Sequence, residues 1–245
     1  FRRRNHPHVQ RTRALAHLAV VRHIAGYVGG ALRHDGASRL EGGLCIHRWR
    51  ILAAFGFWRI FWVLFSITLH ELAHGWAALS QGDQTPRELN RMTANPLVQM
   101  GTTSLIFFFI IGIAWGMMPV NPSRFRDGRR GEIIVAAAGP LMNLLLAFLS
   151  LTVLGVVIAF GPEQPGNWLR AIETFLLVGG FLNLILFALN LLPIPPLDGS
   201  RILGAMSIRI RHFYSQPQSQ LLSLGLLVAI FFFGAGNFIF AGSIE

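Results

Sequence analysis

Long apolar runs, separated by short polar stretches, dominate the chain. No charged residue occurs in 133–160, 174–197 or 221–244. A helix needs about 20 apolar residues to cross the hydrocarbon core of a bilayer, and each run is long enough once its ends and a tilt are allowed for. Buried helices of a large soluble protein would need polar helices to cover them, and the sequence offers none. The pattern therefore predicts an all-α membrane protein, a polytopic helical bundle.

Five apolar segments are long enough to be membrane spans. They are residues 51–79, 97–118, 132–160, 168–192 and 221–241. The second differs from the others because Gly101, Gly112 and Gly116 interrupt it. Irregular backbone is tolerated at membrane depth only where protein or water lines it. This segment therefore either spans fully or dips into the membrane and returns, as a β or other re-entrant element.

Charges in the loops orient the later helices. Residues 119–131 carry four arginines and one aspartate, and residues 193–220 are also basic, whereas residues 161–167 carry one glutamate and no arginine. Because basic residues are concentrated in cytoplasmic loops, we expect the first two loops in the cytoplasm. The third loop and the C-terminus are then outside.

The polar stretch 80–96 bears on the course of the second segment. It carries Arg87 and Arg91. If 97–118 spans fully, these arginines lie outside, and if it dips and returns they lie in the cytoplasm with the other basic loops. The dipping course agrees better with the charge rule, and we favour it.

The composition agrees with a membrane protein. Hydrophobic residues make up 53% of the chain and charged residues 13%, whereas soluble domains carry about 25% charged residues. The single cysteine, Cys45, excludes an internal disulfide framework and a multi-cysteine metal site. The net charge is +10, and all 21 basic residues are arginine. Nothing further points to nucleic-acid binding, because beyond residue 50 the charge lies in loops, where membrane topology explains it.

Residues 1–50 differ from the rest of the chain. They hold ten arginines and two acidic residues, and their apolar stretch 14–21 is too short to span. The alternatives are a signal peptide, a basic cytoplasmic tail, an additional crossing within 14–32, or a stretch translated from upstream of the true start, since the chain begins with Phe1. We therefore divide the chain into a basic segment, 1–50, of doubtful structure and a transmembrane domain, 51–245, which holds the candidate chemistry.

Three ionisable side chains interrupt the first apolar segment. His70, Glu71 and His74 form an HExxH motif. Residues four apart lie on one face of a helix, about one turn apart, so both imidazoles can bind one zinc ion. Glu71 can then act as a general base without being a ligand. Two histidines satisfied within a helix core are the simpler alternative, but three ionisable groups in one turn of a membrane segment are costly and mark a functional site.

A zinc site of this kind needs a third protein ligand. Asp198 is the candidate, because it is the only acidic residue between Glu173 and Glu245 and it ends an apolar span. Prolines break the helix before it, and Gly199 permits an unusual backbone angle after it. On spacing alone, Asp198 can equally be the N-cap of the next helix.

Taken together, the two motifs resemble the site-2 protease family of intramembrane metalloproteases. That family carries HExxH on one transmembrane helix and NxxPxxxLDG at another. The chain matches the second motif at Asn190, Pro193, Leu197, Asp198 and Gly199. The resemblance covers about residues 60–205, in the order typical of the family.

The resemblance implies a role for each matching residue. The implied zinc ligands, for one ion per chain, are His70, His74 and Asp198, with Glu71 as the catalytic base. Asn190 and Asn143 would position the substrate or stabilise the oxyanion. Hydrogen bonding between helices is the alternative role for Asn143.

The resemblance also implies features of the surrounding structure. A membrane-dipping β element would lie at 89–105, and its edge would bind the substrate as an added strand. The zinc would lie near the cytoplasmic side. No insertion is long enough for a PDZ domain, so the chain resembles a minimal member of the family.

The sequence therefore predicts an intramembrane zinc endopeptidase that cleaves peptide bonds in or near transmembrane segments. Its partners would be transmembrane protein substrates and the lipid bilayer, with no nucleic acid, and it would be a multi-pass protein of a prokaryotic cytoplasmic membrane. One alternative is an inactive relative that binds membrane partners, against which the intact Glu71 argues. Another is an ion or metal transporter, which does not explain the pattern of Asn190–Gly199. The oligomeric state is left open.

Overall fold

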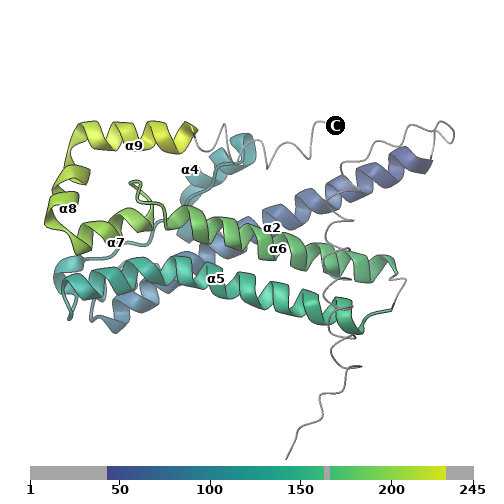
Figure 1. Cartoon of the computed structure of the whole chain (residues 1–245), viewed down its shortest axis with the longest axis horizontal. Helices are drawn as coiled ribbons and strands as arrows, with labels where there is room; N and C mark the ends of the chain where they lie inside the picture. The colour runs from purple at the N-terminus through teal and green to yellow at the C-terminus, as the bar shows by residue number, and fades with distance from the viewer. Residues whose placement is uncertain (1–42, 163–165, 230–245) are drawn as a thin grey trace, which may run out of the picture.

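The computed structural model describes residues 43–162 and 166–229, and every element in these ranges is a helix (Figure 1). The elements are α2 (Gly43–Ser80), α3 (Thr85–Glu88), α4 (Pro96–Ile111), η1 (Pro122–Arg124), α5 (Arg129–Phe160), α6 (Asn167–Asn190), α7 (Asp198–Met206), α8 (Ile208–Ser215) and α9 (Pro217–Ala229). The all-α class is therefore confirmed for the described part. The expectations for residues 1–42 and 230–241 lie outside it.

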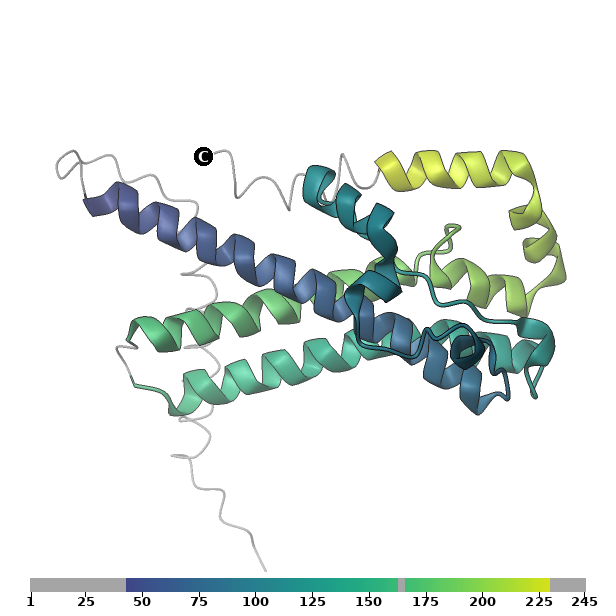
Figure 2. The ribbon, with the colours of Figure 1, turned by 180° about the vertical axis from the view of Figure 1, so that it is seen from behind.

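Three long helices, α2, α5 and α6, form the body of the molecule. α5 and α6 run antiparallel and side by side, and α2 crosses them at an angle (Figures 1 and 2). Most of each predicted segment, 132–160 and 168–192, lies in a single helix, α5 and α6 respectively, and α6 ends at Asn190. Gly161 and Gly166, both in extended conformation, stand where α5 ends and α6 begins.

Several polar side chains of these helices are buried, and many large apolar ones are exposed. Asn143 of α5 and Asn183 of α6 are completely buried, whereas Phe148 and Phe160 of α5 are 64% and 86% exposed. By length and composition, α5 and α6 are the two described helices able to cross a membrane, yet only 22% and 33% of their most apolar stretches are buried. This distribution is the reverse of that in a soluble bundle, where the apolar face packs inward.

The crossing of α2 over α6 depends on a glycine. A Cβ atom on Gly179 would overlap the Trp62 ring, so the indole packs directly on the backbone of α6. The indole nitrogen of Trp62 also donates to the carbonyl of Phe175, at 2.9 Å. This contact fixes α2 against α6 about two helical turns before the HExxH motif.

The region 97–118 doubles back on itself. α4 bends at Gly101, where φ is +73°, and ends at Gly112, where φ is +80°, values that glycine adopts readily. The chain then returns alongside the helix. The Ser104 hydroxyl donates to the carbonyl of Trp115, at 2.6 Å, and accepts from its amide, at 2.9 Å.

A second contact continues this pairing. The amide of Met117 donates to the carbonyl of Gln99, at 3.1 Å, so 113–118 runs back along α4, as the re-entrant alternative requires. The expected β element at 89–105 is wrong for the described structure. α4 occupies the second half of that range, and the extended stretch that follows α4 has no strand beside it.

Arg91 anchors the returning segment from the preceding loop. Its guanidinium donates to the carbonyls of Val98 and Met117, at 2.5 and 2.7 Å. Its own carbonyl accepts from the side-chain amide of Gln99, at 2.5 Å. Arg91 therefore has a structural role that explains its presence in 80–96 without reference to the side of the membrane.

Asp83 joins the chain just after α2 to Asn121, just beyond the returning stretch 113–118. Its buried carboxylate accepts from the amide of Asn121, at 2.7 Å, and from the amide and hydroxyl of Thr85, at 3.0 and 2.5 Å. Burial alone raises the pKa of Asp83, but these hydrogen bonds and the charge of Arg124 outweigh it, so the pKa lies below its usual value. The ionised carboxylate thus holds the end of the segment in place.

Three shorter helices follow α6. α7 packs against α5, and α8 turns away from α7 into α9 (Figure 1). The Tyr214 hydroxyl on α8 donates to the carbonyl of Pro193, at 2.7 Å, which ties α8 to the chain that follows α6. The predicted span 221–241 begins within α9, and its remainder lies outside the described residues.

Candidate metal centre

α2 carries both histidines of the HExxH motif on one inward face. The helix contains no proline from Gly43 to Ser80, so the spacing of four residues becomes one regular turn. The rings of His70 and His74 have centroids 4.7 Å apart, and the two residues are 7% and 3% exposed.

Asp198, the first residue of α7, lies against both histidines of α2. Its Oδ2 lies 3.1 Å from Nε2 of His70 and 3.3 Å from Nε2 of His74. The two Nε2 atoms are 3.1 Å apart. Residues 128 positions apart therefore direct three donor atoms at one point, and these are the three residues that the sequence predicts as ligands.

The backbone after α6 places Asp198. Prolines stop the helix, and α7 begins at Asp198 with Leu197 in the N-cap position. The alternative role of Asp198 as the N-cap is therefore wrong, because its carboxylate faces the histidines instead. Gly199 is needed beside it, since a Cβ there would overlap the carbonyls of Leu191 and Leu192.

A hydrogen bond that Nδ1 donates orients each imidazole. Nδ1 of His74 lies 2.7 Å from the carbonyl of Val135, and Nδ1 of His70 lies 2.6 Å from Oδ1 of Asn143. Both acceptors are on α5. With Nδ1 protonated, each ring presents the lone pair of Nε2 to the centre, as metal-binding histidines do.

The donor set and the space available fit zinc. Two imidazole nitrogens and one carboxylate oxygen, all within 4.8 Å of one another, form a ligand set used by catalytic zinc. Gly139 of α5 faces the same point, because a Cβ atom there would overlap Nε2 of both His70 and His74. The absence of a side chain at Gly139 leaves room for an ion.

Glu71 lies beneath the returning segment 113–118. It is 7% exposed, and a Cβ atom on Gly116 would overlap its side chain. The amide of Met118 donates to its carboxylate, which is close enough to the two histidines and Asp198 to interact with their charges. The carboxylate is therefore held beside the metal centre and is not one of its three ligands.

Comparison with known protein families gives the same assignment. The profile described as Peptidase family M50 matches residues 58–164 and 156–233, which include all three ligands and Glu71. The chain belongs to peptidase family M50. The resemblance to site-2 proteases that the two motifs predicted is thus confirmed.

Several relatives of this M50 chain carry the provisional name of zinc metalloprotease. YwhC of Bacillus subtilis is 37% identical over 142 residues, which are 58% of this chain and 65% of YwhC. Rip2 of Mycolicibacterium smegmatis is 35% identical over 142 residues, 56% of this chain and 52% of Rip2. MJ0611 of Methanocaldococcus jannaschii is 34% identical over 106 residues, 40% of this chain and 50% of that protein. The chain thus spans between half and two thirds of these relatives, and no solved structure gives a significant match.

The two predicted asparagines of the M50 chain lie in different places. The side-chain amide of Asn143 donates to Oδ1 of Asn183, at 3.0 Å, while its oxygen faces His70. Asn190 donates to the carbonyl of Leu186 on its own helix, at 2.9 Å. Asn143 thus makes the interhelical bonds of its alternative role, and a part for Asn190 in substrate binding stays a prediction.

Sequence reasoning missed Asn183, Gly139 and Gly116. Asn183 carried a usable signal, because it is a lone polar residue inside an apolar run and such residues in membrane segments are costly. The two glycines carried no such signal, since their importance depends on the histidines and the glutamate that pack against them.

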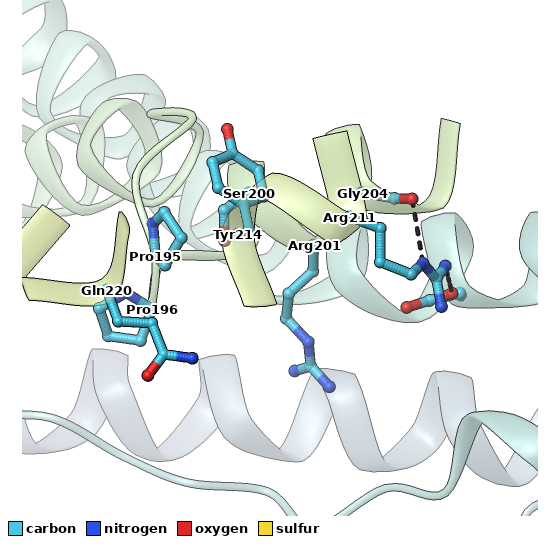
Figure 3. Close-up of a pocket in the computed structure, with 9 residues that line it drawn as sticks. Pro195, Pro196, Ser200, Arg201, Gly204, Arg211, Tyr214 and Gln220 are labelled. Atoms are coloured by element: carbon cyan, nitrogen blue, oxygen red, sulfur yellow. Dashed lines mark hydrogen bonds and ion pairs between the residues drawn. The ribbon is translucent and has the colours of Figure 1, made fainter. Parts of the chain in front are cut away.

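The structure also holds a pocket of about 490 Å³, whose lining includes neither the three ligands nor Glu71. Pro195, Ser200 and Arg201 line one part of it (Figure 3). Arg211 of α8 crosses another part and bonds to the carbonyl of Gly204, at 3.2 Å, and to the carboxylate of Glu132, at 2.5 Å. These bonds tie α8 to α7 and to the first turn of α5.

Proposed function

We propose that this protein is an intramembrane zinc endopeptidase that hydrolyses peptide bonds in or near transmembrane segments of its substrates. The convergence of His70, His74 and Asp198 on one point, with Glu71 beside it, carries this proposal. Two histidines alone would suit many proteins. A third ligand brought from 128 residues away, in a chain of peptidase family M50, favours metal-dependent hydrolysis.

The residues of the centre divide the chemistry between them. Zinc, when bound by His70, His74 and Asp198, supplies a Lewis acid that polarises a carbonyl and acidifies water. Glu71 takes the proton of the attacking water and delivers it to the leaving amine. Burial of Glu71 beneath 113–118 excludes bulk water from this transfer.

The returning segment supports binding of an extended substrate. In the described part of the chain, the amide and carbonyl of Gly116 form no hydrogen bond, whereas those of Trp115 bond to Ser104. Gly116 lies against Glu71. A substrate strand that pairs with Gly116 would place its backbone beside the base, as in strand addition. This edge lies at 113–118 rather than in the 89–105 range that the sequence suggested.

The surroundings support a site inside a membrane. Many of the large exposed side chains of α5 and α6 are apolar, and most of the most apolar stretch of each helix is not buried by protein. Gly139 lies ten residues from the start of α5, which is about 15 Å along the helix axis. We place the centre below the surface, toward the end of α5 that carries the basic loop 119–131, which we propose is cytoplasmic.

Replacement of Glu71 by glutamine tests the proposed activity. We expect Glu71→Gln to reduce the rate of cleavage of a single-span model substrate about 10²–10⁴-fold, which is the usual contribution of a general base. Zinc content, measured by mass spectrometry of the purified protein, is expected to stay near that of the wild type. Glu88→Gln, at an exposed glutamate of α3, is the matched control and should cleave normally. Normal cleavage by Glu71→Gln would refute the protease assignment.

A further inference from the structure

Two buried asparagines lie in series behind His70. Oδ1 of Asn143 is 2.6 Å from Nδ1 of His70. The amide of Asn143 donates to Oδ1 of Asn183, at 3.0 Å, and the amide of Asn183 donates to the carbonyl of Gly179, at 2.9 Å. Both asparagines are completely buried, so no exchange with bulk water interrupts the series.

The end of the series sets its direction. The carbonyl of Gly179 only accepts hydrogen bonds, so the group of Asn183 that faces it must be the amide. The oxygen of Asn183 then faces Asn143, so Asn143 must donate a hydrogen bond to it from its own amide. This leaves the oxygen of Asn143 facing His70, and an oxygen acceptor there requires a proton on Nδ1 of His70.

His74 needs no such series. Its Nδ1 lies 2.7 Å from the carbonyl of Val135. A backbone carbonyl only accepts hydrogen bonds, so it always requires a proton on Nδ1. The carboxamide of Asn143 can reverse, because its oxygen and its amide are almost the same size. If Asn143 flipped, its amide would face Nδ1 of His70, and the imidazole would carry its proton on Nε2.

The flipped state would oppose metal binding. A proton on Nε2 of His70 would point at Oδ2 of Asp198, 3.1 Å away, and this hydrogen bond would stabilise the wrong tautomer in the metal-free protein. Nε2 would then have no lone pair for zinc. Something must hold Asn143 in the correct orientation, and in the described structure the only side chain bonded to its amide is Asn183.

We propose that Asn183 is a positioning residue for the metal centre, which fixes the metal-binding tautomer of His70 through Asn143. It touches neither metal nor substrate and acts only by defining which way the carboxamide of Asn143 faces. The inference rests on the proposed zinc site and adds a residue of α6 to it. Gly179, which packs against Trp62 of α2, also supplies the carbonyl at the end of the series.

The zinc dissociation constant, measured by competition with a chelating dye, tests this role. Asn183→Leu fills a similar volume without a polar group, and we expect zinc binding about 10–100-fold weaker, as for other groups that orient metal ligands. Asn183→Asp keeps an oxygen that accepts from Asn143, and we expect it to stay close to the wild type. Val178→Ala, at a buried position of α6 outside the series, controls for loss of packing and should not change the affinity.

A second background separates orientation from folding. Asn143→Asp places a carboxylate against Nδ1 of His70. Either oxygen of the carboxylate accepts a hydrogen bond from Nδ1, so a flip of this side chain changes nothing. In that background we expect Asn183→Leu to cause no further loss of zinc affinity. An equal loss in both backgrounds, or no loss in either, would overturn the role of Asn183. Failure of the wild type itself to bind zinc would instead overturn the proposed function.

Discussion

At the scale of single residues, Gly139 controls the space in which the metal would lie. Its α-carbon faces the Nε2 atoms of His70 and His74 so closely that a methyl group there would overlap both. We expect Gly139→Ala to remove zinc binding while the helices stay folded, because the added atom occupies the place of the ion. Zinc content of the purified protein and its far-ultraviolet circular dichroism are the two measurements.

The same helix supplies a matched control for that substitution. Gly155 of α5 has open space where its Cβ would be, so Gly155→Ala should bind zinc like the wild type. Wild-type zinc content in Gly139→Ala would mean that the histidines do not converge as the structure places them. Loss of helical signal together with zinc would show a folding defect rather than a blocked site.

Residue identity was predictable from the sequence where chemistry fixes the spacing. His70, Glu71 and His74 form one turn of helix. Asp198 was predicted because the run around it holds no other acid and because Asn190–Gly199 resembles the second motif of the site-2 protease family. Asn183 and Gly139 were not predicted as parts of the site, because their roles exist only through neighbours on other helices. Asn143 was predicted either to act in the reaction or to bond between helices, but its contact with His70 was not predicted, since the sequence does not show which residue its oxygen faces.

At the scale of the element, the contact of Trp62 with Gly179 sets the distance between α2 and α6. We expect Gly179→Ala to destabilise the protein by about 1–3 kcal/mol, the usual cost of overpacking, because the indole has no room to retain its bond to Phe175. Thermal unfolding in detergent measures this. Gly155→Ala should be neutral or stabilising, by up to about 1 kcal/mol, since alanine favours helix. Equal melting temperatures for Gly179→Ala and the wild type would contradict the packing argument.

Elements were predictable in proportion to their regularity. The helices at 129–160 and 167–190 agree with the predicted spans to within a few residues, because an uninterrupted apolar run leaves the backbone little choice but a helix. The region 97–118 was harder. Its bend at Gly101 and its return along Ser104 and Gln99 depend on glycine angles and on hydrogen bonds between distant residues, which periodicity does not encode.

At the scale of the whole molecule, the basic segments gather at one end of the α5–α6 pair. The loop before α5 and the helices α7 and α8 lie together there, and the end of α5 and the start of α6 lie at the opposite end (Figures 1 and 2). Arg211 of α8 bonds to Glu132 in the first turn of α5, which holds the two basic regions side by side. The charge rule treats these regions as separate loops, and the structure brings them to the same end of the helix pair. A cytoplasmic position for this end is the proposal that the next experiment tests.

Labelling of single cysteines by a membrane-impermeant maleimide tests this orientation. Cys45→Ser removes the only cysteine, and Ser123→Cys or Asn167→Cys then adds one at an exposed position before α5 or at the start of α6. We expect Asn167→Cys to react in intact cells and Ser123→Cys to react only after permeabilisation, because one crossing by α5 separates them. Reaction of both on the same side would show that α5 does not cross, and the opposite pattern would place the metal centre near the outer face. Unchanged zinc content in both variants would show that the label reports on the native fold.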